Sequence, residues 1–545
     1  CFLAIYSEPC LEPTSKKETI DYKNNEKDRE ALRKAIQSLY KKDNFVPCVI
    51  GGEEIYTGDE QLQKTPHNHK RTLVKLYYGT QYHIRTAIKK ALRAQETWGT
   101  APVYEKVKIW RKCADIIDQE DRHLLTAAII LGQSKTYLEA DKDTTRILKT
   151  LRNTATYLEE FSKFNLKSSS PDNIFPIQRL RPLDGFVAAV GPFNMTSISC
   201  NLAFTPAIMG NSVLWKPSNN CIYASYIAFK AMQKAGLPKG VINFVPANGN
   251  LFLETVAQSS HLSGVNFTGH LDTLRAIWHT VGFNIYTYRS FPRIVGECGG
   301  KNYHFVHESA DLNLVIKATT DAAFEYSGQK CTSCSRLYVP ASVWPQISCG
   351  LQEAMSSIKI GDSCDFSSYS SAVINEAAFN KIVSYLLYAE KNEPSVEVIC
   401  GGDFNKTLGY FIEPTVLLCK NPFDCLMNEE ILGPVLSVYV YDNNCLAEIL
   451  TIIAKTSKYA LTGSIFAKDD EIICKVLKAL RMTSGNIYIN NKCTGSKLSL
   501  KIYAGNRLSG TNDNLGPQHN LLRWSSPQLV EELILRDSEF YDDYN

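Results

Sequence analysis

The chain has 545 residues, 44% hydrophobic and 21% charged, a balance typical of a globular protein large enough for two or more domains. Its net charge of +3 is too small to attract nucleic acid or a membrane surface, so neither is expected as a partner. The 17 cysteines are odd in number and irregularly spaced, which argues against a disulfide-stapled secreted domain and favours a reducing compartment.

The amino-terminal part carries no membrane or secretory signal. Residues 1–30 are rich in Glu and Lys and lack an apolar core, so no signal peptide is visible. The longest uncharged apolar stretch nearby, from Leu124 to Gly132, is too short to span a bilayer.

Helical periodicity marks the first third of the chain. It predicts helices over 27–41 and 81–98 and around an apolar stripe further on. The stripe consists of Ile147, Leu148, Leu151, Ala155 and Leu158. The polar, irregular stretch 162–184 is either a linker or a β-hairpin flap that pairs with another subunit.

From residue 185, short apolar runs alternate with segments long enough for one helix. The runs are 186–190, 212–215, 241–245 and 264–267. This alternation predicts a parallel sheet with helical crossovers. Ligands of such sheets bind beyond the carboxyl ends of the strands, so the residues that follow each run are candidates for a site.

A second series of strand-like runs predicts a second α/β domain. These runs are 336–339, 371–374, 396–400, 411–418, 435–440, 462–466 and 486–489. The tail from Asp537 to Asn545 is acidic, and we expect it to be frayed.

Six short motifs have chemical potential, and the first three of them follow predicted strands. They are Gly191-Pro192-Phe193-Asn194, Trp215-Lys216-Pro217-Ser218, Phe267-Thr268-Gly269, Gly296-Glu297-Cys298-Gly299-Gly300-Lys301, Gly328-Gln329-Lys330-Cys331 and Glu429-Glu430-Ile431-Leu432-Gly433-Pro434-Val435. Each alone has an ordinary explanation, because a lone cysteine is more often a small buried hydrophobe and Asn after Pro-Phe is usually a turn residue.

The pair Cys331-x-x-Cys334 has the spacing of a redox couple or half a zinc site. No second pair at zinc-ligand spacing is present, so no metal is expected.

The ordered set of motifs resembles the aldehyde dehydrogenase superfamily from about residue 30 onward. Within it, the set is most similar to the subfamily of 1-pyrroline-5-carboxylate dehydrogenases. The runs that carry this resemblance are GFVAAVGPFN, VLWKPS, INFVPA, NFTG, GECGGKN, FEYSGQKC, CSRLYVP, EEILGPVLSVYVY and SGTND.

The resemblance implies an α/β, aldehyde dehydrogenase-like fold. It would comprise amino-terminal helices and a Rossmann-type parallel-sheet NAD domain over 1–296, with a β-hairpin oligomerisation flap. A second α/β domain, the catalytic domain, would span 297–500. Residues 501–545 would form a C-terminal return and oligomerisation segment. The flap and a strand near 521–524 would hold at least a dimer, and the compartment would be the mitochondrial matrix.

The implied reaction is NAD-dependent oxidation of glutamate semialdehyde to glutamate in proline breakdown. Cys331 would attack the aldehyde as a thiolate and form a thiohemiacetal. The Asn194 amide and the Cys331 backbone N–H would stabilise the oxyanion, where losing one donor typically costs ~3–4 kcal/mol. Hydride transfer would leave a thioester, and Glu297 would activate the water that hydrolyses it.

The resemblance also assigns binding residues. Lys216 and Glu430 would bind ribose hydroxyls, and Gly191 would lie beside the cofactor. A helix opening after Gly269 would face the pyrophosphate, and the remaining residues of that segment are His270, Leu271, Asp272 and Thr273. Thr332, Gly495 and Ser496 would bind the substrate carboxylate, although Gly495-Ser496 alone would be taken for a turn.

Several positions depart from the family pattern. His270 stands where a serine is usual, Asn219 where an acidic residue often contacts ribose, and Leu432 where Phe is usual. Met195 and Tyr503 replace two phenylalanines that flank the substrate. Ile502-Tyr503-Ala504-Gly505 stands in place of Pro-Phe-Gly-Gly.

Two other functions remain open at this point. A catalytically weak relative would bind NAD without turnover and act in binding or assembly. A cysteine hydrolase using Cys331 and Asn194 would cleave esters without NAD, but no convincing histidine lies near Cys331 in the chain.

Overall fold

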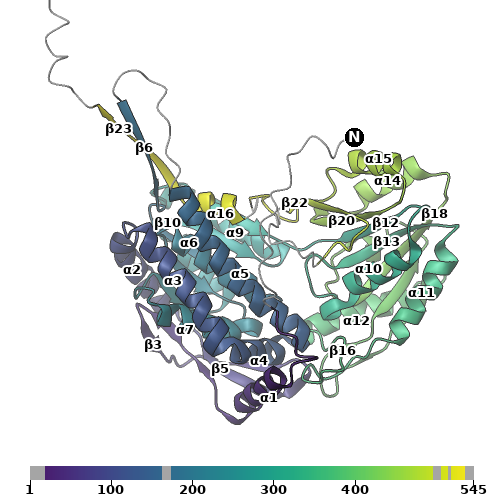
Figure 1. Cartoon of the computed structure of the whole chain (residues 1–545), viewed down its shortest axis with the longest axis horizontal. Coiled ribbons are helices and arrows are strands. Elements are labelled where there is room, and N and C mark those ends of the chain that lie inside the picture. The colour runs from purple at the N-terminus through teal and green to yellow at the C-terminus, as the bar shows by residue number, and fades with distance from the viewer. Residues whose placement is uncertain (1–18, 163–173, 495–504, 514–516, 534–545) are drawn as a thin grey trace, which may run out of the picture.

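A computed structural model describes residues 19–162, 174–494, 505–513 and 517–533. The chain forms two lobes, each built around a seven-stranded sheet (Figure 1). The amino-terminal lobe carries most of the helices of the first half of the chain, and the strands between residues 302 and 489 form the other lobe.

The sheet of the first lobe confirms the first predicted series of strands. Its order is β11-β10-β7-β8-β9-β2-β3. The strands are β2 (Cys48–Ile50), β3 (Glu53–Ile55), β7 (Phe186–Val190), β8 (Ser212–Lys216), β9 (Ile242–Phe244), β10 (Leu262–Thr268) and β11 (Arg293–Glu297). Strands β7 to β11 are parallel, whereas β2 joins β9 antiparallel. Because β8 and β10 flank β7 on opposite sides, the strand order reverses there, the position at which such sheets bind ligands.

Helices cover both faces of this sheet, which is why its strands are apolar on both sides. Along β7, Val187 and Ala189 join one core cluster while Phe186 and Ala188 join another. The helices are α1 (Glu26–Lys41), α2 (Gln81–Trp98), α3 (Val103–Ile116), η1 (Ile117–Asp121), α4 (Arg122–Gln133), α5 (Tyr137–Ser162), α6 (Thr196–Ile208), η2 (Asn219–Cys221), α7 (Ile222–Ala235), α8 (Gly249–Ala257), α9 (Leu271–Phe283) and η3 (Ile285–Thr287). The predicted helices at 27–41 and 81–98 are therefore confirmed, and the predicted apolar stripe is buried along α5.

A small sheet supports this lobe beside α4. Its order is β1-β5-β4, and the strands are β1 (Phe45–Val46), β4 (Glu60–Thr65) and β5 (Asn68–Tyr77).

The sheet of the second lobe has the order β14-β17-β18-β13-β12-β20-β21. Its strands are β12 (Asn302–Val306), β13 (Cys334–Pro340), β14 (Val396–Cys400), β17 (Thr415–Cys419), β18 (Val435–Tyr441), β20 (Thr462–Phe466) and β21 (Asn486–Ile489). The remaining short strands are β15 (Phe404–Asn405), β16 (Phe411–Ile412), β19 (Tyr459–Ala460) and β22 (Asn506–Arg507). The helices are α10 (Leu312–Phe324), η4 (Glu325–Gly328), α11 (Trp344–Ser356), α12 (Glu376–Lys391), α13 (Cys425–Asn428), α14 (Leu446–Thr456) and α15 (Asp470–Leu480).

Two strand predictions in this lobe were wrong. The run 371–374 is buried but forms no strand, and 411–418 is divided into β16 and β17. Pro414 lies in the break, where a residue without an N–H cannot donate to a ladder.

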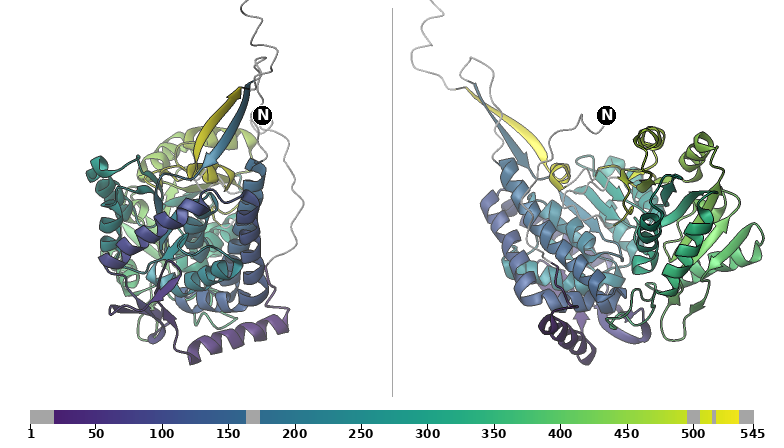
Figure 2. Two further views of the ribbon diagram at one scale, coloured as in Figure 1. Left: turned by 90° about the vertical axis from the view of Figure 1, so that its left-hand side faces the viewer. Right: turned by 45° about the vertical axis from the view of Figure 1, so that its right-hand side comes forward.

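A two-stranded arm joins distant parts of the chain. Strand β6 (Ile174–Arg181) pairs antiparallel with β23 (Ser526–Leu533), and Figure 2 shows the arm projecting from the first lobe. The stretch 162–184 was predicted to be a linker or a β-hairpin flap that pairs with another subunit. Its described part contributes β6, which pairs with β23 of the same chain, and pairing with a second subunit stays a prediction. The strand predicted near 521–524 lies further along the chain, because Pro517–Arg523 form helix α16 and β23 begins at Ser526.

None of the helices in the described ranges combines the length and apolar character that a bilayer crossing requires.

Candidate active site

Cys331 lies on a tight turn between η4 and β13, and its side chain is half-buried. The Asn302 side chain at the start of β12 donates to the Cys331 carbonyl at 2.7 Å and to the Ser333 carbonyl at 2.8 Å. Its own oxygen accepts from the Thr462 N–H at 3.0 Å. The turn that presents the thiol is therefore fixed to two neighbouring strands.

The backbone before this turn is strained. Tyr326, Ser327 and Gly328 have φ of 56°, 50° and 67°, and such a conformation costs roughly 1–3 kcal/mol for each residue other than glycine. The Tyr326 hydroxyl donates to the Gln133 carbonyl at 3.0 Å, and the Ser327 hydroxyl to the Ser371 carbonyl at 2.5 Å. A Cβ at Gly328 would lie 2.1 Å from a backbone oxygen, so only glycine fits there.

Asn194 follows β7, and its side chain reaches the same turn. The buried amide Nδ2 donates to the Gln329 carbonyl at 2.9 Å, two residues before Cys331. An amide nitrogen has two N–H groups, so a second one is left to donate to a ligand.

A buried ion pair fixes the start of α6, directly after Asn194. The Asp143 carboxylate accepts from the Thr196 N–H at 2.9 Å and the Ser197 N–H at 3.1 Å. It also pairs with Lys135 at 2.7 Å, and both side chains are buried. The oxyanion candidate is thus held at the junction of a strand end and a capped helix.

Glu297 ends β11 and is enclosed by the carboxyl-terminal segment of the chain. Its Oε2 accepts from the Gly505 N–H at 3.1 Å, while Oε1 is buried without a partner among the described residues. Burial raises the pKa of this carboxyl to about 8. A carboxylate with that pKa and a free lone pair suits a general base.

The electrostatics of Cys331 show that these groups share one site. Burial, together with the charges of Glu430 and Glu297, raises the pKa of the Cys331 thiol to about 12, although Arg146 acts to lower it. The thiol of this ligand-free chain is therefore protonated at neutral pH, and attack requires a nearby base or cation.

Glu430 and Lys216 are the two residues predicted to bind ribose hydroxyls. Glu430 is buried, and its Oε1 accepts from the Gly300 N–H at 3.0 Å. Lys216 ends β8, and burial lowers the pKa of its ammonium group to about 8. Within the described residues the Nζ of Lys216 has no hydrogen bond or ion pair, so this half-buried side chain can take a hydroxyl partner. This unpaired donor fits a nucleotide cofactor.

The predicted pyrophosphate segment opens α9 at the end of β10. Gly269 donates to the Glu297 carbonyl at 3.1 Å, which ties the segment to the base. His270 is the cap residue, and its Nδ1 accepts from the Asp272 N–H at 3.3 Å. Leu271 is buried, whereas Asp272 and Thr273 are exposed. The imidazole therefore occupies one of the backbone donors that an anion would use.

Gly191 lies between β7 and α6, and its N–H donates to the Lys216 carbonyl at 3.1 Å. A Cβ at Gly191 would lie 2.3 Å from the Ser199 hydroxyl, so a side chain there would separate strand from helix.

The predicted substrate site is described only in part. The Thr332 and Thr494 hydroxyls are hydrogen-bonded at 2.6 Å, which joins the turn of Cys331 to the next loop. Gly495 and Ser496 lie outside the described residues, as does Tyr503.

Two positions that depart from the family pattern have clear local partners, and a third has a left-handed backbone. Met195 Sδ accepts from Arg146 at 3.2 Å, and Asn219 donates to the Tyr78 hydroxyl. Leu432 has φ 58° in the turn before β18.

Sequence reasoning missed Asn302 and a charged cluster beside the nucleophile. Glu325 pairs with Lys330 at 2.6 Å and with Lys492 at 3.0 Å. Asn302 belongs to a motif that was recognised, but nothing in its spacing shows that it holds Cys331. The lysine at 492 is too distant in sequence to be connected with Glu325.

Comparisons with known proteins agree with this geometry. Residues 56–530 match the model of the aldehyde dehydrogenase family. The chain is 44% identical over 523 residues to the mitochondrial delta-1-pyrroline-5-carboxylate dehydrogenase of Danio rerio, which covers 94% of this chain and 92% of that protein. It is 43% identical over 515 residues to the Homo sapiens protein of the same name, with 93% and 90% covered. The crystal structure of the Mycobacterium tuberculosis delta-pyrroline-5-carboxylate dehydrogenase bound with NAD is similar at a TM-score of 0.91 and 35% identity, covering 98% of both chains.

Proposed function

The chain belongs to the aldehyde dehydrogenase family, and we propose that it oxidises L-glutamate 5-semialdehyde to L-glutamate with NAD in proline breakdown. The semialdehyde is the open form of 1-pyrroline-5-carboxylate, the compound named in the relatives that match nearly the whole chain. One observation carries the proposal: the charges of Glu297 and Glu430 both act on the Cys331 thiol, although the three residues come from separate parts of the chain.

Cys331 acts as the nucleophile. Its sulfur attacks the aldehyde carbon as a thiolate, and the carbonyl oxygen becomes the oxyanion of a thiohemiacetal. The second N–H of Asn194 and the Cys331 backbone N–H donate to that oxyanion. Because Asn302 and the strained turn hold the Cys331 backbone, these donors are already oriented before the substrate arrives.

Glu297 acts as the general base. With a pKa of about 8, its carboxyl group both holds and releases a proton near neutral pH. It first accepts the thiol proton, directly or through water, and later takes a proton from the water that attacks the thioester. The products of that attack are the free thiol and the carboxylate of glutamate.

Lys216 and Glu430 would hold NAD through the ribose hydroxyls, with the start of α9 beside the pyrophosphate. When bound, NAD accepts the hydride that leaves the aldehyde carbon. The unpaired Lys216 and the buried Glu430 carboxylate match a donor and an acceptor for a diol.

The substrate carboxylate is bound by Thr332 and by the loop that contains Gly495 and Ser496. The hydrogen bond between Thr332 and Thr494 supports this, because it holds the beginning of that loop against the nucleophile turn. An anchor of this kind selects aldehydes that carry a carboxylate at the far end.

We also propose the larger organisation. Residues 1–296 bind the cofactor, 297–500 form the catalytic domain, and 501–545 return to complete the site and a homodimer through the β6–β23 arm. The names of the relatives include "mitochondrial", which supports a mitochondrial location, and we propose the matrix.

The direct test follows NADH formation from glutamate semialdehyde, with NAD and NADP compared and a panel of other aldehydes. We expect turnover with NAD and preference for glutamate semialdehyde. Cys331→Ala should abolish oxidation, whereas Cys349→Ala, on the exposed face of α11, should leave it unchanged. Retention of turnover by Cys331→Ala, or NAD binding without any turnover in the unaltered protein, would contradict the proposal.

A further inference from the structure

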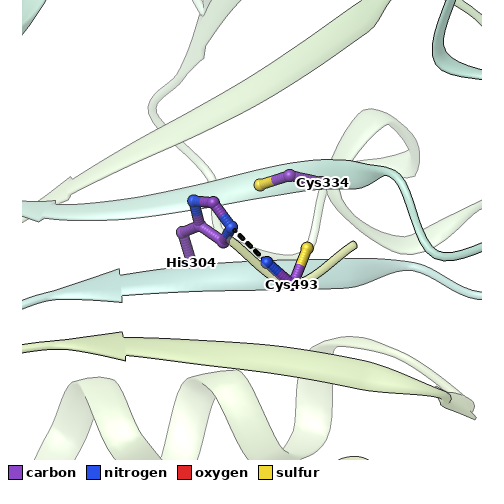
Figure 3. Close-up of side chains that lie close together, drawn as sticks. All are labelled: His304, Cys334 and Cys493. Carbon is purple, nitrogen blue, oxygen red and sulfur yellow. Dashed lines mark hydrogen bonds between the residues drawn. The ribbon is translucent and has the colours of Figure 1, made fainter. Parts of the chain in front are cut away.

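A buried cluster of soft ligands lies behind the nucleophile turn. His304 of β12, Cys334 of β13 and Cys493 after β21 come from three separate parts of the chain (Figure 3). One ligand atom from each lies within 4.8 Å of the others, and all three residues are buried. The mechanism proposed above uses none of these side chains.

The hydrogen bonds of His304 determine which ring nitrogen carries the lone pair. The Cys493 N–H lies 3.2 Å from Nε2, and since a backbone amide can only donate, Nε2 must carry the lone pair. The proton is then on Nδ1, which donates to the Thr319 hydroxyl at 2.9 Å. Nδ1 is thus oriented by a hydrogen bond, as the second nitrogen of a metal-binding histidine is. The Nε2 lone pair accepts from the Cys493 N–H, and a bond to an ion would replace that hydrogen bond.

The two thiols lie within hydrogen-bonding reach of each other, and Cys493 also reaches His304 and Thr462. Cys334 donates to the Arg336 carbonyl at 3.4 Å, and Cys493 donates to the Thr332 carbonyl at 3.4 Å. Thiols are weak donors, so little is lost when both protons leave. The Thr332 carbonyl also lies close enough to Cys493 to serve as an oxygen ligand.

We propose that His304, Cys334 and Cys493 bind a Zn²⁺ ion or a similarly soft divalent cation. Binding releases two thiol protons, and the resulting two thiolates and neutral imidazole balance the charge of the ion. Bonds of about 2.3 Å to sulfur and about 2.0 Å to nitrogen require only a modest contraction of the cluster. A disulfide would require the sulfurs to approach to about 2.05 Å and would leave the histidine without a role.

The position of this cluster gives the ion a consequence for the active site. Cys334 is three residues from Cys331, and Cys493 precedes Thr494, whose hydroxyl contacts Thr332. A bound ion would fasten the nucleophile turn to the loop that leads to Gly495 and Ser496. The inference does not depend on dehydrogenase activity, because the ligands lie outside the catalytic set.

The test removes the competing active-site thiol. Chelator-treated, fully reduced Cys331→Ala protein is titrated with Zn²⁺, and bound metal is measured by equilibrium dialysis and elemental analysis. Co²⁺ in place of Zn²⁺ reports the ligands by its sulfur charge-transfer absorption and its tetrahedral visible bands. The same measurements are made on Cys331→Ala combined with Cys493→Ser, and on Cys331→Ala combined with Cys474→Ser as an exposed-thiol control.

We expect about one equivalent of Zn²⁺ per chain, a thiolate–Co²⁺ spectrum and a raised Tm with Zn²⁺, since a ligand of the native state stabilises it. Cys493→Ser should lose all three, and Cys474→Ser should retain them. Binding that persists undiminished in the Cys493→Ser protein would overturn the proposal. Absence of binding to the Cys474→Ser protein would also overturn it. A mass two daltons lower after mild oxidation, with no zinc taken up beforehand, would indicate a disulfide instead of a metal site and would overturn the proposal as well. If the Cys493→Ser protein unfolds, the Co²⁺ spectrum of the Cys474→Ser control decides the question by itself. A spectrum without sulfur charge-transfer absorption would exclude this site.

Discussion

Glu297 illustrates a conflict at the scale of a single residue. Its catalytic value depends on burial that leaves one carboxylate oxygen without a partner, and the same burial makes the ionised form costly to the fold. The native carboxyl has a pKa of about 8, above its ordinary value of 4.5, so the unfolded chain ionises first as pH rises. The native state therefore loses stability between these two values, by an amount of the order of 5 kcal/mol.

Glu297→Gln should consequently abolish most turnover while stabilising the ligand-free protein. We expect thioester hydrolysis to fall roughly 10²- to 10⁴-fold. The gain in free energy of unfolding should grow from about pH 4.5 to about pH 8, as measured by urea denaturation across that range. Glu254→Gln, an exposed change on α8, should show neither effect. Equal stability of Glu297→Gln and the unaltered protein at pH 8.5 would contradict the assigned burial cost.

Glu325 shows the opposite behaviour. Burial alone raises the pKa of this carboxyl, but Lys330, Lys492 and Lys142 outweigh that effect and hold it at about 2. Since the native pKa is lowered, the group stabilises the fold above pH 4.5 and loses this contribution as pH falls toward 2. The difference corresponds to about 3 kcal/mol.

Glu325→Gln should therefore be less stable at pH 7, and the deficit should shrink below pH 4.5. The measurement is the free energy of unfolding at pH 7 and pH 3, at low and at moderate salt. Glu390→Gln, an exposed substitution on α12, serves as the control. A deficit that is constant with pH would mean that lost packing, and not charge, explains the effect.

At the scale of secondary-structure elements, the start of α6 connects stability to catalysis. Asp143 accepts two backbone N–H groups of this helix and pairs with the buried Lys135. Asn194 immediately precedes the helix, so a shift of its first turn moves the oxyanion donor.

Asp143→Asn should lower stability by about 3–5 kcal/mol, because it leaves the Lys135 charge buried without a counter-charge. It should also reduce kcat more than it changes KM for glutamate semialdehyde. Adding Lys135→Met should restore much of the lost stability, as followed by Tm, without restoring kcat. Recovery of kcat together with Tm would show that Asp143 acts on stability alone.

Sequence patterns predicted elements well where burial follows a simple period. The strands β7 to β10 are apolar on both faces and lie between helices, so continuous runs identify them. The run 371–374 is equally apolar, yet it packs as irregular backbone, with the Val373 N–H bonded to Tyr410 and the Ile374 N–H to Gln329. Burial alone does not distinguish these cases, because both require apolar side chains.

The candidate site was predictable to the extent that its residues follow strand ends. The positions of Asn194 and Lys216 after strand ends were predicted from the motifs, whereas the strand that ends at Glu297 was not. Two other features could not be predicted from the motifs: the hydrogen bond from Gly505 to Glu297 and the left-handed backbone before Cys331. Each depends on contacts between distant segments.

At the scale of the whole molecule, the β6–β23 arm is the most accessible feature to test. It projects from the first lobe, and we propose that it pairs with a second copy of the chain. Truncation after Ser525 removes β23 but keeps the buried Leu521 and Trp524. It should convert a dimer into monomers in light scattering after gel filtration.

Truncation after Leu533 is the matched control, because it keeps the whole of β23 and should leave the mass of the oligomer, per chain, unchanged. A dimer that survives loss of β23 would place the interface elsewhere.

The enclosure of Glu297 by residues 505–510 has a consequence for how the molecule is made. The Gly505 N–H bonds the carboxylate, Ser509 accepts from the next residue along, and Gly510 pairs with Glu297 itself. A nascent chain on the ribosome can complete both large sheets while the surroundings of its base are still missing. Messages that end early, between the last strand of the second sheet and this segment, should therefore yield inert products, which also lack the buried Leu521 and Trp524.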